Sequence, residues 1–284
     1  MRSAGFILAA LLIAASVGLA QPPAVPGVPV GGQPGQPIPP PPPPSVKSDP
    51  KLDAYLGEWE KKMASVANVR MEIALKQTDV VFKKDTNKTG VVLCMKPNYA
   101  ILRLDNVADK IDYEAYICDS KSLYAYNGLQ RSVTKIDIAK NQSVDNLMMN
   151  FLSGMKAKEV KQRFDISLSK TDDYYIYLDI KPLRPSDQRE FKQLRLALYG
   201  PGAATAKVAY LPAKVYMVKP NDDTEMWTFT NPQLDLPGVD AGAFKFSGEI
   251  PKGWKFQEAP QQPVGGPIPA GGALPPGTAV RPNK

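Results

Sequence analysis

The residues that could carry chemistry in this sequence are cysteines and paired aspartates. No histidine occurs among the 284 residues, which excludes Ser-His-Asp and Cys-His nucleophile systems and every zinc site that needs an imidazole. Two thiols, Cys94 and Cys118, are too few for a zinc site made of cysteine alone. The sequence therefore argues against an enzyme, because no nucleophile arrangement can be assembled from it.

Two aspartate pairs, Asp172-Asp173 and Asp222-Asp223, could serve carboxylate chemistry or bind calcium. Each pair lies between two segments of alternating hydrophobicity, where a hairpin turn is expected. Aspartate favours turns because its side chain accepts hydrogen bonds from the nearby backbone. We interpret both pairs as turn residues and predict no catalytic residue, no metal site and no cofactor.

The two ends of the chain differ in composition from the middle. Residues 1–20 begin with a positive charge at Arg2, continue as a small apolar run too short for a spanning helix, and end near Ala20, as in a cleaved signal peptide. Residues 21–50 and 259–284 hold 13 and 7 of the 29 prolines and cannot bury a core. We expect an exported, periplasmic or secreted protein with a disordered linker (21–50), one folded domain (51–258) and a disordered tail (259–284).

Residues 51–66 have the spacing of an amphipathic helix. Asp49 can cap this helix and Pro50 suits its first position. The apolar side chains that recur on one face are Leu52, Tyr55, Leu56, Trp59, Met63 and Val66. Residues 143–154 return to this spacing, and residues 156–164 suggest a further short helix.

Most of the remaining domain alternates between apolar and polar residues, as strands do. About six such segments precede the second helical region and about five follow it, and short turns join most of them. So many twisted strands tend to curl or close. The pattern predicts an α+β fold with a strongly curved antiparallel sheet, or half-open barrel, and helices over its mouth. Those helices either plug the apolar face completely or leave a cavity.

The segment "VVLCMKPNYAILRLD" predicts a tight hairpin with its turn at residues 97–98. In this register Cys94 faces Ile101, and a second hairpin sets Cys118 opposite Tyr99. Both cysteines then lie on the outer face with one strand between them, about 10 Å apart. A disulfide needs Cα atoms closer than about 7 Å. We therefore predict two free thiols and no disulfide.

The order of several segments resembles a known family. After the first helix come "GVVLCMKPNYAILRLD", "YICDSKSLYAYN" and "MMNFLSGMKAKEVKQRFDISL". Together they resemble the periplasmic lipoprotein carriers of the LolA-like family, and most closely the secreted LolA-like proteins of planctomycetes, over about residues 52–255. The resemblance implies an unclosed antiparallel half-barrel of about ten to eleven strands, a helical lid, and an apolar interior that holds acyl chains.

The sequence also departs from the carrier pattern. Carriers place an arginine immediately before the Pro-Asn turn, where it helps to hold the lid shut, whereas this chain has Lys96. Lysine is a point donor and should not fork between two carbonyls, so lid gating of the carrier type is not carried over. Lys96 is left with two roles, a solvated turn residue or a contact to lid carbonyls or a headgroup. Ala100 stands where carriers have a bulky aromatic residue.

The candidate cavity residues are apolar side chains expected to face inward. They are Trp59, Met71, Ile73, Leu75, Leu93, Leu102, Leu104, Phe151, Ile176, Leu178, Leu194, Leu196 and Trp227. Trp59 and Phe151 could instead be ordinary core residues. An acyl chain gains roughly 0.8 kcal/mol per buried methylene, so an apolar trough needs no catalytic group to bind it.

Two function classes stay open after an enzyme is set aside. The first is a monomeric protein that binds lipid or lipoprotein acyl chains, and the second is an envelope sensor or scaffold of the same fold that acts through a protein partner. The formal net charge of +7 suits anionic surfaces such as membrane headgroups. No dense basic stripe with interleaved aromatics indicates nucleic acid. We expect no stable membrane insertion once the signal peptide is removed.

Overall fold

The computed structural model describes residues 49–138 and 156–259. The expected signal peptide, most of the linker, the helix at residues 143–154 with Phe151, and the tail beyond Ala259 lie outside these ranges and stay predictions.

The described chain contains two runs of strands, each preceded by a helix. The first run is α1 (Pro50–Ser65), β1 (Asn68–Asp79), β2 (Lys84–Met95), β3 (Tyr99–Asn106), β4 (Tyr113–Asp119), β5 (Ser122–Asn127) and β6 (Ser132–Asp137). The second is α3 (Ala157–Arg163), β7 (Phe164–Thr171), β8 (Tyr175–Pro182), α4 (Pro185–Gln188), β9 (Gln193–Tyr199), η1 (Ala206–Val208), β10 (Pro212–Val218), β11 (Thr224–Leu234), η2 (Ala241–Phe244) and β12 (Lys255–Glu258).

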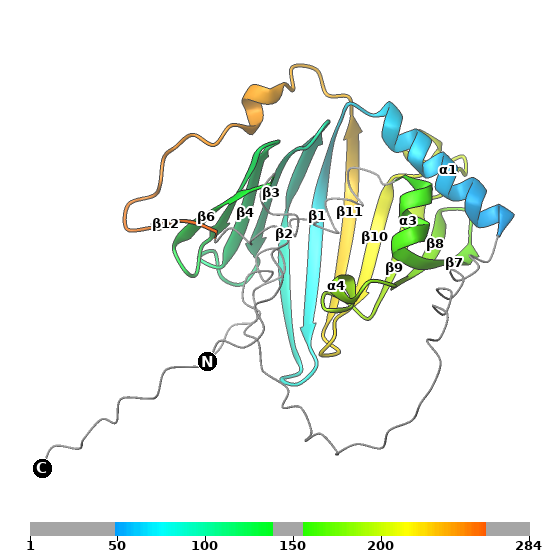
Figure 1. Ribbon diagram of the computed structural model, residues 1–284, viewed down its shortest axis with the longest axis horizontal. Helices are drawn as coiled ribbons and strands as arrows, with labels where there is room; N and C mark the ends of the chain where they lie inside the picture. The colour runs from blue at the N-terminus through cyan, green and yellow to red at the C-terminus, as the bar shows by residue number, and fades with distance from the viewer. Residues whose placement is uncertain (1–48, 139–155, 260–284) are drawn as a thin grey trace, which may run out of the picture.

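All twelve strands form one curved sheet (Figure 1). Its order is β12-β6-β5-β4-β3-β2-β1-β11-β10-β9-β8-β7, so the pairing of β1 with β11 joins the two runs. Every described pair is antiparallel except β12 with β6. The end strands β12 and β7 do not pair with each other, and the barrel stays open. The expected α+β half-barrel is confirmed, with slightly more strands than predicted.

The helix α1 forms where its capping residues predict. The Asp49 carboxylate accepts hydrogen bonds from the backbone of Lys51 (3.0 Å) and Leu52 (3.2 Å), and Pro50 occupies the first turn. Such a cap stabilises a helix by about 1 kcal/mol. The buried side chains of α1 are Leu52, Leu56, Trp59 and Met63, which face the sheet.

The short helices α3 and α4 support the β7–β10 side of the sheet. A bidentate pair, Arg163 with Asp187, joins them at 2.7 and 2.8 Å, and both side chains are buried. The backbone N–H of Ala157 at the start of α3 also donates to the Glu60 carboxylate of α1 at 3.0 Å. These contacts fix α3 beside α1.

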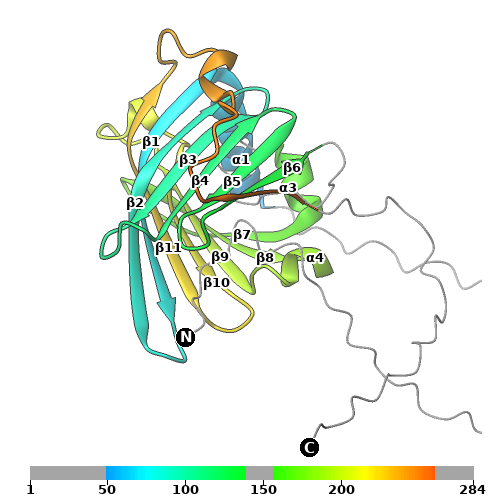
Figure 2. The ribbon, with the colours of Figure 1, turned by 90° about the vertical axis from the view of Figure 1, so that its left-hand side faces the viewer.

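The two faces of the sheet have different covers. In Figure 2, α1 lies behind the sheet and residues 235–258 run in front of it. This C-terminal segment places aromatic rings on the convex face, with Phe246 stacked on Tyr124 at 4.1 Å and Trp254 5.9 Å from Tyr113. Within the described ranges, no helix is both long and apolar enough to cross a bilayer.

Candidate functional site

The concave face brings together the described candidate residues, apart from Leu93, in one buried cluster with α1. They are Trp59, Met71, Ile73, Leu75, Leu102, Leu104, Ile176, Leu178, Leu194, Leu196 and Trp227, each at most 3% exposed. Four buried side chains of α1, Leu52, Leu56, Trp59 and Met63, belong to this cluster. A ligand can therefore reach the part of the face that α1 covers only if α1 moves away from it.

The prediction that Leu93 faces inward is wrong. Val92 lies opposite Leu102 and is buried, whereas Leu93 is half-buried on the other face. Met95 pairs with Tyr99, so the connection has three residues rather than the expected two, and the register shifts by one. Because side chains alternate along a strand, a shift of one residue moves all of them to the opposite face.

Both cysteines were expected on the outer face. The shift in the β2–β3 hairpin corrects the position of Cys94, and a second one-residue shift, in the β3–β4 hairpin, corrects that of Cys118. Cys94 pairs with Ala100 and Ala100 pairs with Cys118, so both thiols lie on the concave face with β3 between them. Both are free thiols in the structure. Burial, and to a smaller extent the Cys118 sulfur, raises the pKa of Cys94 to about 12. Burial also raises the pKa of Cys118, whose Sγ donates to the Asn98 carbonyl at 2.9 Å.

We expect Cys94 to resist alkylation in the folded protein. Only the thiolate is nucleophilic, and a pKa of about 12 leaves almost none of it at mildly alkaline pH. Time-resolved thiol counting should show Cys118 reacting first and Cys94 only on unfolding, with Cys118→Ser as the control that removes the early phase. Denatured, unreduced protein should show two reactive thiols, and a count of no reactive thiols would contradict the strand order.

Lys96 connects the β2–β3 turn to the C-terminal end of α1. Its Nζ donates to the carbonyl of Met63 at 2.5 Å and to that of Ala64 at 2.7 Å. The inference that lysine cannot serve two carbonyls is wrong here, because an ammonium carries three donors and the two oxygens are neighbours on the last turn. A cation at this end also interacts favourably with the helix dipole. Burial lowers the pKa of Lys96, and the nearby Asp235 opposes that shift.

The two ends of α1 are held differently. Just after the helix, the Asp235 carboxylate accepts from the backbone of Ala67 at 2.7 Å, and the Lys96 backbone N–H donates to the Ala67 carbonyl at 3.1 Å. Near the first turn, α1 is held by an ion pair of Asp53 with Lys161, both partly exposed. Exposed ion pairs contribute only about 0–1 kcal/mol. The C-terminal end is therefore the better anchored one.

Buried charges that the sequence pattern did not predict lie at the opposite end of the concave face. Lys88 is 2% exposed and contacts Glu114 at 2.6 Å and Asp112 at 3.5 Å. The Tyr116 hydroxyl donates to Glu114 at 2.9 Å, and burial, followed by the Glu114 charge, holds the pKa of Tyr116 well above its usual range. These groups place a polar cluster where the apolar face ends.

A second buried cluster surrounds Glu225 on β11. Lys219 lies 2.8 Å from its carboxylate, Gln77 donates to it at 3.0 Å, and the Trp227 indole donates at 3.1 Å. The alternation along each strand could have identified these residues. Lys88 is an even number of residues from the inward-facing Val92, and Glu225 is two residues from the inward-facing Trp227. Polar residues on an apolar face need partners, and here they come mainly from other parts of the sheet, β4 for Lys88 and β1 and the β10–β11 turn for Glu225.

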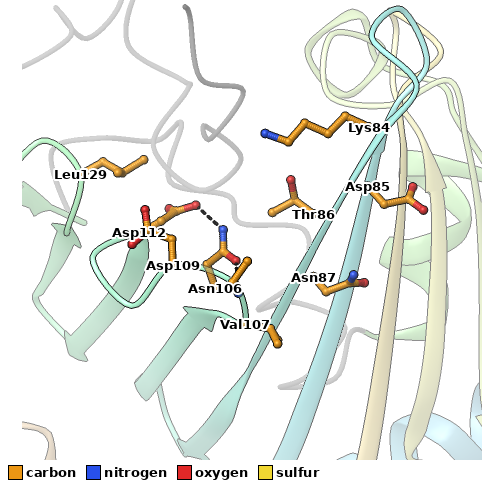
Figure 3. A pocket seen from close by; sticks show the side chains of 10 residues that line it. Lys84, Asp85, Thr86, Asn87, Asn106, Val107, Asp109, Asp112 and Leu129 are labelled. Atoms are coloured by element: carbon orange, nitrogen blue, oxygen red, sulfur yellow. Dashed lines mark hydrogen bonds between the residues drawn. The ribbon is translucent and has the colours of Figure 1, made fainter.

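A polar pocket of about 370 Å³ opens beside the Lys88 cluster (Figure 3). Its lining residues are Lys84, Asp85, Thr86, Asn87, Asn106, Val107, Ala108, Asp109, Asp112 and Leu129. The Asn106 side-chain amide donates to Asp112 at 2.8 Å across it. The pocket offers amine, hydroxyl, amide and carboxylate groups, so it can bind a polar group through hydrogen bonds.

The interpretation of the aspartate pairs as turn residues is confirmed. Asp172 lies between β7 and β8 and accepts from the backbone of Tyr174 (3.0 Å) and Tyr175 (2.7 Å), and the Tyr174 N–H is the main cause of its lowered pKa. Asp223 lies between β10 and β11 and accepts from the backbone of Val80 at 2.9 Å. These bonds define the local turn geometry.

No protein-family model and no curated protein matches the sequence. Solved structures that resemble the fold include a DUF1329 family protein from Desulfovibrio piger (8% identity, 70% of this chain, 99% of the other, TM-score 0.39). The lipoprotein LppX from Mycobacterium tuberculosis is similar at 9% identity (68% and 100% covered, TM-score 0.38). A LolA superfamily protein from Nitrosomonas europaea follows at 9% identity (67% and 97% covered, TM-score 0.34).

Proposed function

We propose that the protein is an exported, non-enzymatic binding protein that holds lipid or lipoprotein acyl chains against its concave face. The observation that carries this proposal is a continuous apolar face against which the amphipathic helix α1 packs, with the C-terminal end of α1 tied to the β2–β3 turn by Lys96. The sequence resemblance to LolA-like carriers, including the secreted planctomycete group, supports it. In this proposal the protein acts in the periplasm or outside the cell, and residues 51–258 form the binding domain.

The free energy needed to displace α1 and the free energy gained by burying an acyl chain in its place are of similar size. Displacing the four buried side chains of α1 costs roughly 6–12 kcal/mol, at about 1.5–3 kcal/mol for each side chain. An acyl chain of about 16 carbons gains on the order of 12 kcal/mol when fully buried. One long chain can therefore replace the helix face, while a short chain cannot.

The anchoring of α1 sets the direction of its movement. Lys96 and Asp235 hold the C-terminal end through hydrogen bonds, whereas the N-terminal end is held by its packed side chains and the weak Asp53–Lys161 pair. In the proposed mechanism α1 pivots about the link at Ala67, its first turn leaves the sheet, and the acyl chain enters below it.

Removing the Lys96 ammonium should weaken the attachment of α1 to the sheet. We expect Lys96→Met to lower the free energy of unfolding by about 1–2 kcal/mol and to speed uptake of a fluorescent fatty acid, because the last-turn carbonyls lose their donor. Lys96→Arg is the matched control and should stay near wild type in both. Stopped-flow uptake and chemical denaturation measure the two effects. Equal uptake rates in all three proteins would contradict the role of this contact.

Native mass spectrometry of protein released from the envelope of exporting cells tests the proposal against the sensor or scaffold alternative. We expect a monomer that carries lipid, identified after organic extraction. Lipid-free protein that co-purifies with a second envelope protein would favour the alternative.

A further inference from the structure

Exposed apolar side chains gather on the connections along one rim of the sheet. These connections lie at the lower end of their strands in Figure 1. The side chains are Val80, Val81 and Phe82 between β1 and β2, Val107 and Ile111 between β3 and β4, and Leu129 between β5 and β6. The backbone N–H of Val107 donates to Asn87 of β2 and that of Gly128 donates to Tyr113 of β4, so the second and third connections are bonded to the strands beside them. A soluble surface normally scatters such residues singly.

The β1–β2 hairpin forms the most prominent part of this rim. Val81 and Phe82 are 75% and 77% exposed, the highest values for large apolar side chains in the described ranges. The hairpin continues beyond its neighbour, since Lys88 already pairs with the last residue of β3, Asn106.

Carboxylates inside the rim satisfy backbone donors of this tip. The Phe82 N–H donates to Asp79 at 2.8 Å and the Val80 N–H donates to Asp223 at 2.9 Å. The tip can therefore move from water into an apolar medium with both N–H groups still hydrogen-bonded. An N–H group without a partner would be unfavourable there.

The charges around the tip fall into two groups. Basic side chains stand next to the apolar ones, and among the residues described Lys83, Lys84 and Lys110 form no salt bridge. The rim carboxylates instead have partners within the protein. Asp79 and Asp223 bond the tip backbone, Asp85 pairs with Lys76, Asp109 accepts from Ile111, Asp112 contacts Lys88, and Asp222 pairs with Lys192.

We propose that this rim docks the protein on the surface of an anionic phospholipid bilayer. Val81 and Phe82 enter the boundary between headgroups and acyl chains, and Lys83 and Lys84 contact lipid phosphates. This docking is peripheral and reversible, and it does not depend on acyl-chain uptake by the concave face.

A bilayer fits these observations better than a protein partner does. The apolar groups sit on protruding turns, whereas a protein interface would need a shaped pocket to receive each of them. A bilayer interface accepts an apolar tip without such a pocket and favours flanking lysines. The formal net charge of +7 adds a general attraction to anionic surfaces.

Vesicle partitioning of the exported, full-length processed protein tests the apolar part. We expect binding to phosphatidylglycerol–phosphatidylcholine vesicles, lowered about 10-fold or more by Val81→Ser with Phe82→Ser. The control is Tyr174→Ser, an exposed aromatic on the β7–β8 turn at the opposite rim, which should bind as wild type. Unchanged melting curves confirm that the variants fold.

A second pair of variants tests the charges. Lys83→Gln with Lys84→Gln should lower binding to the anionic vesicles about 10- to 30-fold and leave the weak binding to pure phosphatidylcholine unchanged. Lys121→Gln with Lys207→Gln, at the opposite rim, is the charge-matched control and should have a small effect.

Insertion itself can be observed with Phe82→Trp. Brominated phospholipid should quench the new indole, whereas the buried Trp59 and Trp227 of the wild type should be unaffected by vesicle binding. Absence of wild-type binding to either vesicle, or full binding by the Val81/Phe82 variant, would overturn the proposal. Loss of an envelope protein partner from that variant, without vesicle binding by wild type, would assign the rim to a protein instead.

Discussion

Replacing Leu178 with glutamate is expected to lower the free energy of unfolding by about 4–5 kcal/mol, because the position is fully buried on the concave face of β8. The change removes an apolar side chain and buries a carboxyl group among Leu168 and Leu196, which pair with it from β7 and β9. Chemical denaturation measures the loss directly.

The matched control is Gln193→Glu, at an exposed position of the adjacent strand β9. It introduces the same carboxylate and should change stability by no more than about 0.5 kcal/mol. If Leu178→Glu lowered the free energy of unfolding as little as this control, the described packing of the concave face would be contradicted. Uptake of a fluorescent fatty acid should be lost in Leu178→Glu and kept in Gln193→Glu.

Breaking the buried pair of Arg163 with Asp187 should have a similar effect. We expect Asp187→Ala to lower the free energy of unfolding by about 3–5 kcal/mol, because a buried guanidinium loses its carboxylate. The double variant Arg163→Met with Asp187→Leu should recover most of that loss, since it removes both charges. Equal losses in the single and double variants would show that the pair does not join α3 to α4.

The parts of the fold that follow from local pattern could be predicted. Alternation identified β1 and β8 because one face of each is apolar, and the Asp49-Pro50 pair marked the start of α1. These signals act within a few residues, so they need no knowledge of partners. Most of the described candidate site followed from the same periodicity.

The parts that depend on neighbouring strands could not be predicted. The length of the β2–β3 connection decided whether Val92 or Leu93 faces inward, and a stretch with apolar residues at both positions does not fix it. Lys88 and Glu225 looked like ordinary polar strand residues, since their partners come from β4 and from the β10–β11 turn. The contact of Lys96 with two carbonyls required the end of α1 to be placed in space.

The central claim, that acyl chains bind between α1 and the sheet, is tested most directly by quenching of tryptophan fluorescence with a brominated fatty acid. Trp59 and Trp227 are buried on the concave side, while Trp254 lies on the convex side against Tyr113 and Tyr126. We expect saturable quenching in the wild type, and none in a folded Trp59→Phe with Trp227→Phe variant, whose remaining emission comes from Trp254. No quenching of the wild type, or equal quenching of both proteins, would contradict the account.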